Sequence, residues 1–156
     1  MSTIKIAVFP GSFDPVTKGH EAIVKRALPL FDKIIIAIGH NSQKDKYFSL
    51  EQRKSFLEKT FSHLPNVEIA IFEGLTVDFC KKVSAQFILR GLRSVSDFEF
   101  EKNIAQNNRM LKPEIETVFL LTDLEYNAIT STIVRDIHKH GGDIKKLVPD
   151  AIASEI

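Results

Sequence analysis

The sequence predicts an α/β fold, a doubly wound, five-stranded parallel sheet with helices on both faces. Short apolar or β-branched runs alternate five times with segments of helical periodicity, and the connections between them are short. One run, Ile34 to Ile38, is apolar at every position, which is typical of a central parallel strand covered on both faces. Crossovers in such a sheet are right-handed, so the predicted fold is Rossmann-like.

The elements follow in order along the chain. A β-branched run over residues 4–9 predicts the first strand, which stops at Pro10-Gly11. Apolar residues at helical spacing then predict a helix over residues 18–31. The apolar run at 34–38 is the second strand, and a polar loop follows it.

Later elements are marked by capping and by pattern. Ser49 and Gln52 form a capping box that begins a helix extending to about residue 63. Ser96 and Glu99 form a second such box. The remaining strands are predicted at 67–72, 87–89 and 117–122, and the remaining helices at 76–83, 96–110 and 130–140.

Composition limits the classes of protein. At 156 residues and 17.6 kDa, we expect one domain over residues 1–156. The 44% hydrophobic and 26% charged content excludes disordered, collagenous and coiled-coil chains. A net charge of +1 provides no field for nucleic acid, so we expect no DNA or RNA partner. The absence of a long apolar run predicts no membrane segment.

A single cysteine, Cys80, excludes an internal disulfide and favours a reducing, cytoplasmic location. It lies among apolar residues, so we expect a buried, inert thiol. His63, His138 and His140 do not share a helix face, so they form no metal pair.

In a doubly wound sheet, ligands bind beyond the carboxyl ends of the strands. The loop after the first strand contains Ser12, Thr17 and His20 and enters a helix, whose unpaired N–H groups make an anion site. The alternative is a plain turn in which Asp14-Pro15 caps the helix and His20 is a surface residue. This loop alone does not distinguish the two.

The loop after the fourth strand contains two arginines, Arg90 and Arg93, with Gly91 between them. Two guanidinium groups at this edge suit two phosphate groups. The alternative is a pair of surface ion pairs with acidic residues that follow in sequence, namely Asp97, Glu99 or Glu101.

Two further loops carry polar groups. Three hydroxyl residues, Thr130 to Thr132, follow Tyr126 at a helix start, where one hydroxyl would suffice as a cap. The two additional hydroxyl groups favour a second phosphate-binding site at this helix start, with Tyr126 flanking a purine. Lys44 and Lys46 supply ammonium groups from the loop after the second strand, although such a loop is usually only a solvated segment.

With these motifs in hand, the sequence resembles the bacterial phosphopantetheine adenylyltransferases of the nucleotidyltransferase superfamily. The likeness extends from Ile4 to about Pro149. It rests on Pro-Gly-Ser-Phe-Asp-Pro-x-Thr-x-Gly-His at 10–20, on Arg-Gly-Leu-Arg at 90–93 with Asp-Phe-Glu-Phe-Glu at 97–101, and on Ile-Thr-Ser-Thr-x-x-Arg at 129–135.

The resemblance implies roles residue by residue. It implies catalytic roles for His20, Lys44 and Arg93. It implies ATP binding by Ser12, Phe13, His20, Gly91, Leu92, Arg93, Glu101, Tyr126, Asn127, Ala128, Ile129, Thr130, Ser131 and Thr132. It implies phosphopantetheine binding by Ser12, Lys44, Thr76 and Arg90. Ser42 stands where the family often has proline, so Lys46 competes with Lys44 for its role.

The resemblance further implies a cytosolic enzyme that uses Mg²⁺ with ATP, assembles as a homohexamer and is inhibited by coenzyme A. No metal-ligating side chain is identified. The implied reaction is adenylyl transfer from ATP to 4′-phosphopantetheine by direct in-line attack, giving dephospho-coenzyme A and pyrophosphate. The rivals are a cytidylyltransferase, a nicotinate-mononucleotide adenylyltransferase, and a non-catalytic nucleotide-binding regulator on the same kind of sheet.

Overall fold

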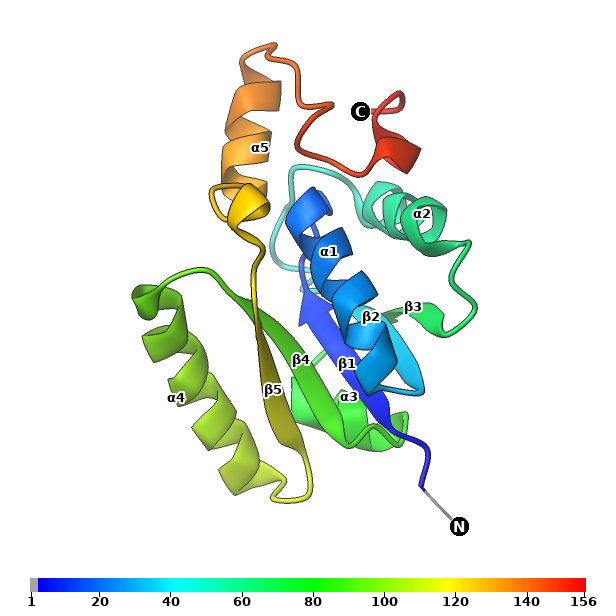
Figure 1. Ribbon diagram of the computed structural model, residues 1–156, viewed down its shortest axis with the longest axis vertical. Helices are drawn as coiled ribbons and strands as arrows, with labels where there is room; N and C mark the ends of the chain where they lie inside the picture. Colours follow the sequence, from blue (N-terminus) through cyan, green and yellow to red (C-terminus); the bar gives the residue numbers. More distant parts are fainter. Residues whose placement is uncertain (1–2) are drawn as a thin grey trace.

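The computed structural model describes residues 3–156 and confirms the predicted fold class. Its five strands are all parallel, in the order β3-β2-β1-β4-β5 (Figure 1). The strands are β1 (Ile6–Gly11), β2 (Lys33–Gly39), β3 (Val67–Phe72), β4 (Phe87–Leu92) and β5 (Glu116–Leu121).

Helices cover both faces of this sheet. They are α1 (Lys18–Ala27), α2 (Leu50–Phe61), α3 (Thr76–Lys82), α4 (Val95–Leu111) and α5 (Ser131–Lys139), with short 3₁₀ turns η1 (Leu28–Leu30), η2 (Leu124–Tyr126) and η3 (Asp150–Ile152). One core contains Ile34, Ile36 and Ile38 of β2 with residues of α1, α2 and α5. The other contains Ile35 and Ala37 with α3. The strand at 34–38 is therefore buried on both faces, as its sequence predicts.

The sheet splits between β1 and its neighbour β4. β1 pairs with β2 over six residues, but with β4 only at Ala7 with Phe87 and at Val8 with Ile88. The strand order also reverses here, because β2 lies on one side of β1 and β4 on the other. The carboxyl ends of β1 and β4 thus diverge at the topological switch point, where α/β folds bind ligands.

Several predicted boundaries are wrong. β1 includes Pro10 and Gly11, and β4 continues through Leu92, so Arg90 and Gly91 lie in the strand rather than in a loop. Helix α1 ends at Ala27 rather than at residue 31, because Pro29 has no N–H to continue the α-helical pattern and the chain tightens into η1.

The predicted capping box of Ser96 and Glu99 is also wrong. Ser94 is the extended N-cap of α4, and its hydroxyl accepts from the Asp97 N–H at 3.2 Å, so Ser96 is already helical. The box of Ser49 and Gln52 is confirmed, with reciprocal hydrogen bonds of 3.1 and 3.0 Å.

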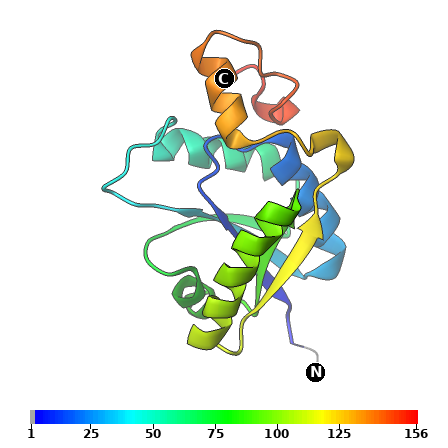
Figure 2. The same ribbon diagram turned by 90° about the vertical axis from the view of Figure 1, so that its left-hand side faces the viewer.

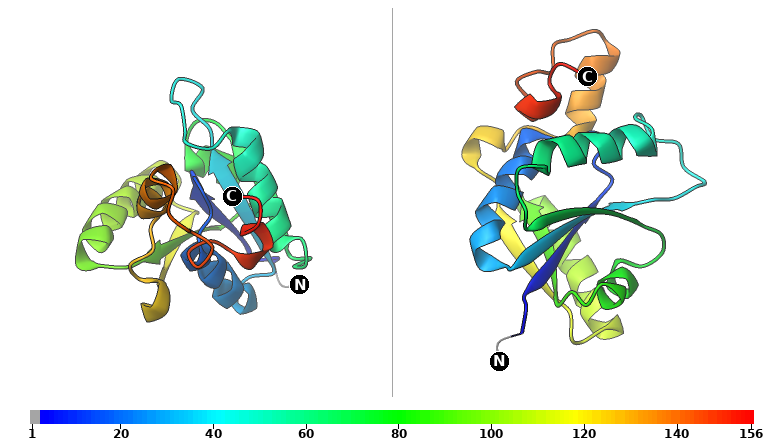
Figure 3. Two further views of the ribbon diagram at one scale, coloured as in Figure 1. Left: turned by 90° about the horizontal axis from the view of Figure 1, so that it is seen from above. Right: turned by 90° about the vertical axis from the view of Figure 1, so that its right-hand side faces the viewer.

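The C-terminal segment 141–156 packs over α1 and α2, although the sequence predicts no element there (Figure 3). Ile144, Val148 and Ile152 are buried in the first core. The Lys18 N–H at the start of α1 donates to the Leu147 carbonyl at 3.0 Å. Within residues 3–156, no helix combines the length and apolar character needed to cross a membrane.

Candidate active site

Backbone carbonyl groups at the end of β1 and in the loop that follows it anchor the connection to α1. Four of them accept hydrogen bonds from side chains of β4, α2 and α5. The pairs are Arg90 to Pro10 at 2.6 Å, Arg53 to Ser12 at 2.9 Å, Arg135 to Asp14 at 2.7 Å, and Ser131 to Pro15 at 2.8 Å. Residues remote in sequence therefore fix the path of this loop.

His20 is positioned by the capping box that begins α1. Its Nδ1 accepts from the Thr17 N–H at 2.9 Å, and the Thr17 hydroxyl accepts from the His20 N–H at 3.4 Å. Because Nδ1 acts as an acceptor, the neutral ring carries its proton on Nε2. The ring also packs edge-on against Phe13, with 5.0 Å between the ring centroids.

Burial, followed by the charges of Arg90 and Arg93, lowers the pKa of His20 to about 4. The imidazole is therefore neutral at physiological pH. It offers the site an Nε2–H donor rather than a positive charge, which corrects the alternative of a plain surface histidine.

Asp14 does not cap α1. Its buried carboxylate accepts from the N–H groups of Tyr47 at 2.9 Å and Phe48 at 2.8 Å. The neighbouring Arg53 is also buried and donates to the Phe48 carbonyl at 3.1 Å. These two groups join the β1–α1 loop to the end of the lysine-bearing loop.

Arg53 was not predicted as a site residue, although the sequence carries a signal for it. Arg53 shares the helical spacing of Phe56, Leu57 and Thr60, all of which are buried on the inner face of α2. An arginine at a core position of an amphipathic helix indicates a buried polar partner. Burial lowers the pKa of Arg53, and the nearby Asp14 charge opposes that shift.

The two arginines of the β4 end both have carboxylate partners. Arg90 donates from Nε and Nη2 to Glu101, which is only 8% exposed. Arg93 donates from Nε to Asp97 at 3.1 Å. The ion pairs considered as the alternative therefore exist. These pairs do not use every guanidinium donor. Arg90 donates three of its five N–H groups, two to Glu101 and one to the Pro10 carbonyl, so two remain for a ligand.

Two adjoining cavities open at the split in the sheet. The first, which we call the His20 cavity, has a volume of about 310 Å³. The second, the Thr76 cavity, has about 290 Å³ and a largely apolar wall that includes Phe72, Ile88 and Ile104. The two cavities share Ser12, Arg90 and Glu101. A ligand in each would thus meet its neighbour at this common wall.

The His20 cavity gathers most of the residues singled out in the sequence. Its lining includes Ser12, His20, Arg90, Gly91, Arg93, Glu101, Ile129, Thr130, Ser131 and Thr132. Arg135, which the sequence motif contained but the site prediction omitted, lines it as well. Thr76 lines the other cavity.

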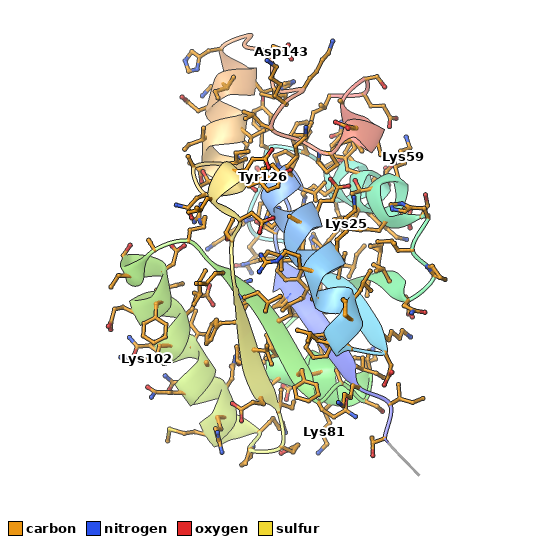
Figure 4. All side chains as sticks on the ribbon, in the orientation of Figure 1. Lys25, Lys59, Lys81, Lys102, Tyr126 and Asp143 are labelled. Atoms are coloured by element: carbon orange, nitrogen blue, oxygen red, sulfur yellow. The ribbon has the colours of Figure 1, made fainter. Side chains whose placement is uncertain are left out.

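The remaining predicted residues lie outside both cavities. Phe13 and Leu92 are buried, and Asn127 and Ala128 are exposed. Tyr126 lies beside the start of α1 (Figure 4). A Cβ atom added to Gly19 would be 3.8 Å from the Cβ of Tyr126. Lys44 and Lys46 lie in the exposed segment 41–47 of the loop after β2, which projects from the carboxyl edge of the sheet (Figure 2).

Each hydroxyl of the Thr130 to Thr132 run has a partner. Thr130 is the N-cap of α5 and accepts from the Ile133 N–H at 3.1 Å. Ser131 holds the Pro15 carbonyl, and Thr132 accepts from Arg135 at 3.2 Å. The two hydroxyl groups that do not cap α5 therefore have structural partners: Ser131 fixes the β1–α1 loop, and Thr132 fixes Arg135.

The chemistry available here is binding and charge stabilisation. The Thr17 hydroxyl lies 3.2 Å from Nδ1 of His20, but it is buried and engaged as the helix cap. Cys80 is a buried residue of α3, and burial raises its thiol pKa to about 12. Among residues 3–156, no group of three or more His, Cys, Asp or Glu side chains is placed to hold a metal.

Comparison with known proteins agrees with this arrangement. Residues 8–137 match the family model described as cytidylyltransferase-like. A Flavobacterium johnsoniae protein named phosphopantetheine adenylyltransferase is 59% identical over 94% of this chain and 95% of its own. One of the same name from Cytophaga hutchinsonii is 52% identical over 93% and 97%.

A solved structure shares the fold. It is a bifunctional NMN adenylyltransferase/ADP ribose pyrophosphatase from Francisella tularensis, with a TM-score of 0.73 and 22% identity. The match covers 94% of this chain but only 45% of that longer one, so it supports the architecture alone. By the family model and the two sequence relatives, the chain belongs to the cytidylyltransferase-like family and, within it, to the phosphopantetheine adenylyltransferases.

Proposed function

We propose that this protein transfers the AMP moiety of ATP to 4′-phosphopantetheine, releasing pyrophosphate and dephospho-coenzyme A. The relatives carry this activity in their name, and they align with almost the whole chain. The observation that carries the proposal is the pair of cavities with a common wall at Ser12 and Arg90. A transferase that joins two anionic substrates needs two adjoining sites with shared cationic and hydroxyl groups.

ATP is assigned to the His20 cavity. This cavity is polar and is lined by residues at the starts of α1 and α5, where the first-turn N–H groups that the caps Thr17 and Thr130 do not satisfy favour an anion. We propose that His20 and Arg93 contact the ATP phosphates. The wider ATP site comprises Ser12, Phe13, Gly91, Leu92, Glu101 and residues 126–132.

The acceptor is assigned to the Thr76 cavity. Its apolar wall suits an uncharged, extended arm, while Ser12 and Arg90 at the common wall suit a terminal phosphate. Thr76 lies at the start of α3, inside this cavity. Lys44, with Lys46 as the alternative, supplies an ammonium group from the projecting loop.

The reaction is a direct displacement at the α-phosphorus. A phosphate monoester with a second pKa of about 6 is mostly dianionic at neutral pH, so its oxygen needs no general base. That oxygen bonds to the α-phosphorus while the bond to the β-phosphate oxygen breaks, and pyrophosphate departs. The protein holds the reactants in line and stabilises the growing charge with His20 Nε2–H and the guanidinium groups.

The divalent metal enters with ATP. Enzymes of this kind that use ATP typically need a divalent ion, and we propose Mg²⁺. The carboxylates nearest the ATP site, Asp97 and Glu101, are paired with arginines, so they are not free to form a metal cage. This arrangement suits Mg²⁺ bound mainly by phosphate oxygens and water, which is its usual mode with nucleotides.

Assembly and regulation complete the proposal. We propose a cytoplasmic homohexamer in which residues 1–156 form one nucleotidyltransferase domain, inhibited by coenzyme A. Phe100 and Leu111 are exposed apolar residues of α4 that line neither cavity, which supports a subunit contact on this side of the helix. Coenzyme A contains an adenine nucleotide and a pantetheine arm, which are the groups assigned to the His20 cavity and to the Thr76 cavity.

The direct test is to incubate the purified protein with Mg²⁺-ATP and 4′-phosphopantetheine and identify the products by mass. We expect dephospho-coenzyme A and pyrophosphate. Turnover instead with CTP, or with nicotinate mononucleotide as acceptor, would favour the rival transferases. Nucleotide binding without pyrophosphate release from any acceptor would favour a regulator.

A further inference from the structure

The loop that joins β2 to α2 carries both candidate lysines, and its two ends are held differently. At its start, the His40 N–H donates to the Phe72 carbonyl at 2.8 Å. Within the loop, the N–H groups of Gln43 and Lys44 donate to Asn41 at 3.0 and 3.1 Å. Residues 41–47 are exposed. The orientation of the lysines therefore depends on how the ends of the loop are anchored.

The far end of the loop has one buried anchor and one exposed anchor. Asp14 and Arg53 hold the backbone of Tyr47 and Phe48 from inside the protein. The Tyr47 hydroxyl, at the surface, lies 2.6 Å from Nδ1 of His138, and the two rings meet edge to face. A phenol can donate or accept, so this contact does not depend on the tautomer of His138.

His138 connects the loop to the helix that closes the His20 cavity. It lies on α5, whose first residues, Ser131 and Thr132, line that cavity. One turn before His138, Arg135 holds the Asp14 carbonyl. The same helix thus contacts the ATP-side cavity at one end and the base of the lysine loop near the other.

We propose that Tyr47 and His138 are positioning residues, whose hydrogen bond fixes the base of the lysine loop against α5. From this anchor, Lys44 or Lys46 reaches the reacting phosphates. A loop with both ends fixed searches a smaller volume, so more encounters place the ammonium group correctly. This inference rests on the proposed adenylyl transfer.

The first test removes the hydrogen bond and keeps both rings. Tyr47→Phe is expected to lower turnover roughly three- to tenfold, which is the range of one neutral hydrogen bond. The KM for ATP should stay within about twofold, because Tyr47 lies outside the His20 cavity. The melting temperature should not change, since the contact is exposed. His138→Ala should behave alike, while His140→Ala on the same helix is the matched control with unchanged turnover.

A double-mutant test separates positioning from a general structural effect. In a Lys44→Ala/Lys46→Ala background, under single-turnover conditions, adding Tyr47→Phe should cause no further loss. Unchanged turnover in both Tyr47→Phe and His138→Ala, or an equal loss in the background without lysines, would overturn the proposal.

Amide hydrogen exchange tests the anchor without any reaction. Tyr47→Phe and His138→Ala should exchange faster over residues 40–47, and His140→Ala should match the wild type. Equal exchange in all variants would overturn the anchor itself. If the wild type formed no dephospho-coenzyme A, the proposed function would fail, and this measurement would still decide whether the contact fixes the loop.

Discussion

At the scale of single residues, the site is built from groups whose protonation and direction are set by their neighbours. His20 is held at Nδ1 by the Thr17 N–H, and burial beside two arginines keeps the ring neutral. Arg90 is held by Glu101 and by the Pro10 carbonyl. Such groups are oriented before a substrate arrives, so little reorganisation is needed during the reaction.

Replacing His20 by alanine tests its assigned part in the reaction. Turnover should fall on the order of 10²–10³-fold, the range for losing one preorganised donor to a transition state. The fold should persist, which circular dichroism checks. Near wild-type turnover of a folded His20→Ala protein would remove this residue from the mechanism.

The lowered pKa of His20 also predicts how stability changes with pH. Its pKa is 6.5 in the unfolded chain and about 4 in the folded protein, so only the unfolded chain gains this proton between those values. Stability therefore falls as pH decreases from 6.5 to 4, and His20 contributes up to about 3 kcal/mol of that loss.

Urea unfolding at pH 7 and pH 4 measures the effect, with His20→Asn as the comparison. The wild type should lose more unfolding free energy than the variant over this interval. Equal losses in the two proteins would show that the folded and unfolded states bind the proton alike.

At the scale of elements, the starts of helices position the chemistry. Thr17 begins α1 beside His20, Ser94 begins α4 one residue after Arg93, and Thr130 begins α5 at the edge of the His20 cavity. Each cap sets where a helix starts and therefore where the polar groups of the preceding strand end point. A change in a cap should act on stability first.

The corrected start of α4 gives a matched pair of variants. Ser94→Ala removes the acceptor for the Asp97 N–H and should cost about 1 kcal/mol of unfolding free energy. Ser96→Ala should change it by less than about 0.5 kcal/mol, because Ser96 is exposed and caps nothing. Denaturant titration of both proteins checks this, and the reverse order would restore the capping box at Ser96.

The regular elements could be predicted because each has a local cause. The fully apolar run at 34–38 indicates a central strand, and reciprocal capping marks the start of α2 at Ser49. Features of the fold that depend on tertiary contacts have no local signal and were not predicted. Strand β4 continues through Arg90 and Gly91 because β5 pairs with them, and that pairing is a tertiary contact.

The candidate site shows the same division. The motif residues His20, Arg90 and Arg93 were identified because their types and positions point to anion binding, and they do line one cavity. The groups that fix the loops around them, such as Arg53 and the contact of Tyr47 with His138, join segments remote in sequence. No local pattern specifies such a pairing.

At the scale of the whole molecule, the divergence of β1 and β4 creates room for two ligands at one sheet edge. The outer side of α4 remains uncovered, with Phe100 66% exposed (Figure 1). Exposed apolar residues in a row are typical of a contact with another protein chain. The proposed hexamer would cover this side of the molecule.

Light scattering tests the assembly. The wild type should have six times the mass of one chain, and Phe100→Asp should form smaller species, because it places a charge in an apolar contact. Circular dichroism should show that the variant remains folded. A wild-type monomer, or a variant that assembles as the wild type does, would contradict the proposed contact.

Stereochemistry at the transferred phosphorus tests the central claim most directly. We would supply one diastereomer of ATP in which sulfur replaces a nonbridging oxygen of the α-phosphate, so that the α-phosphorus is a stereocentre, and determine its configuration in the dephospho-coenzyme A analogue. Two substrates meeting at the wall of Ser12 and Arg90 react in one displacement, so the configuration should invert. Retention would show two displacements through an adenylylated enzyme, and the account of direct transfer would be wrong.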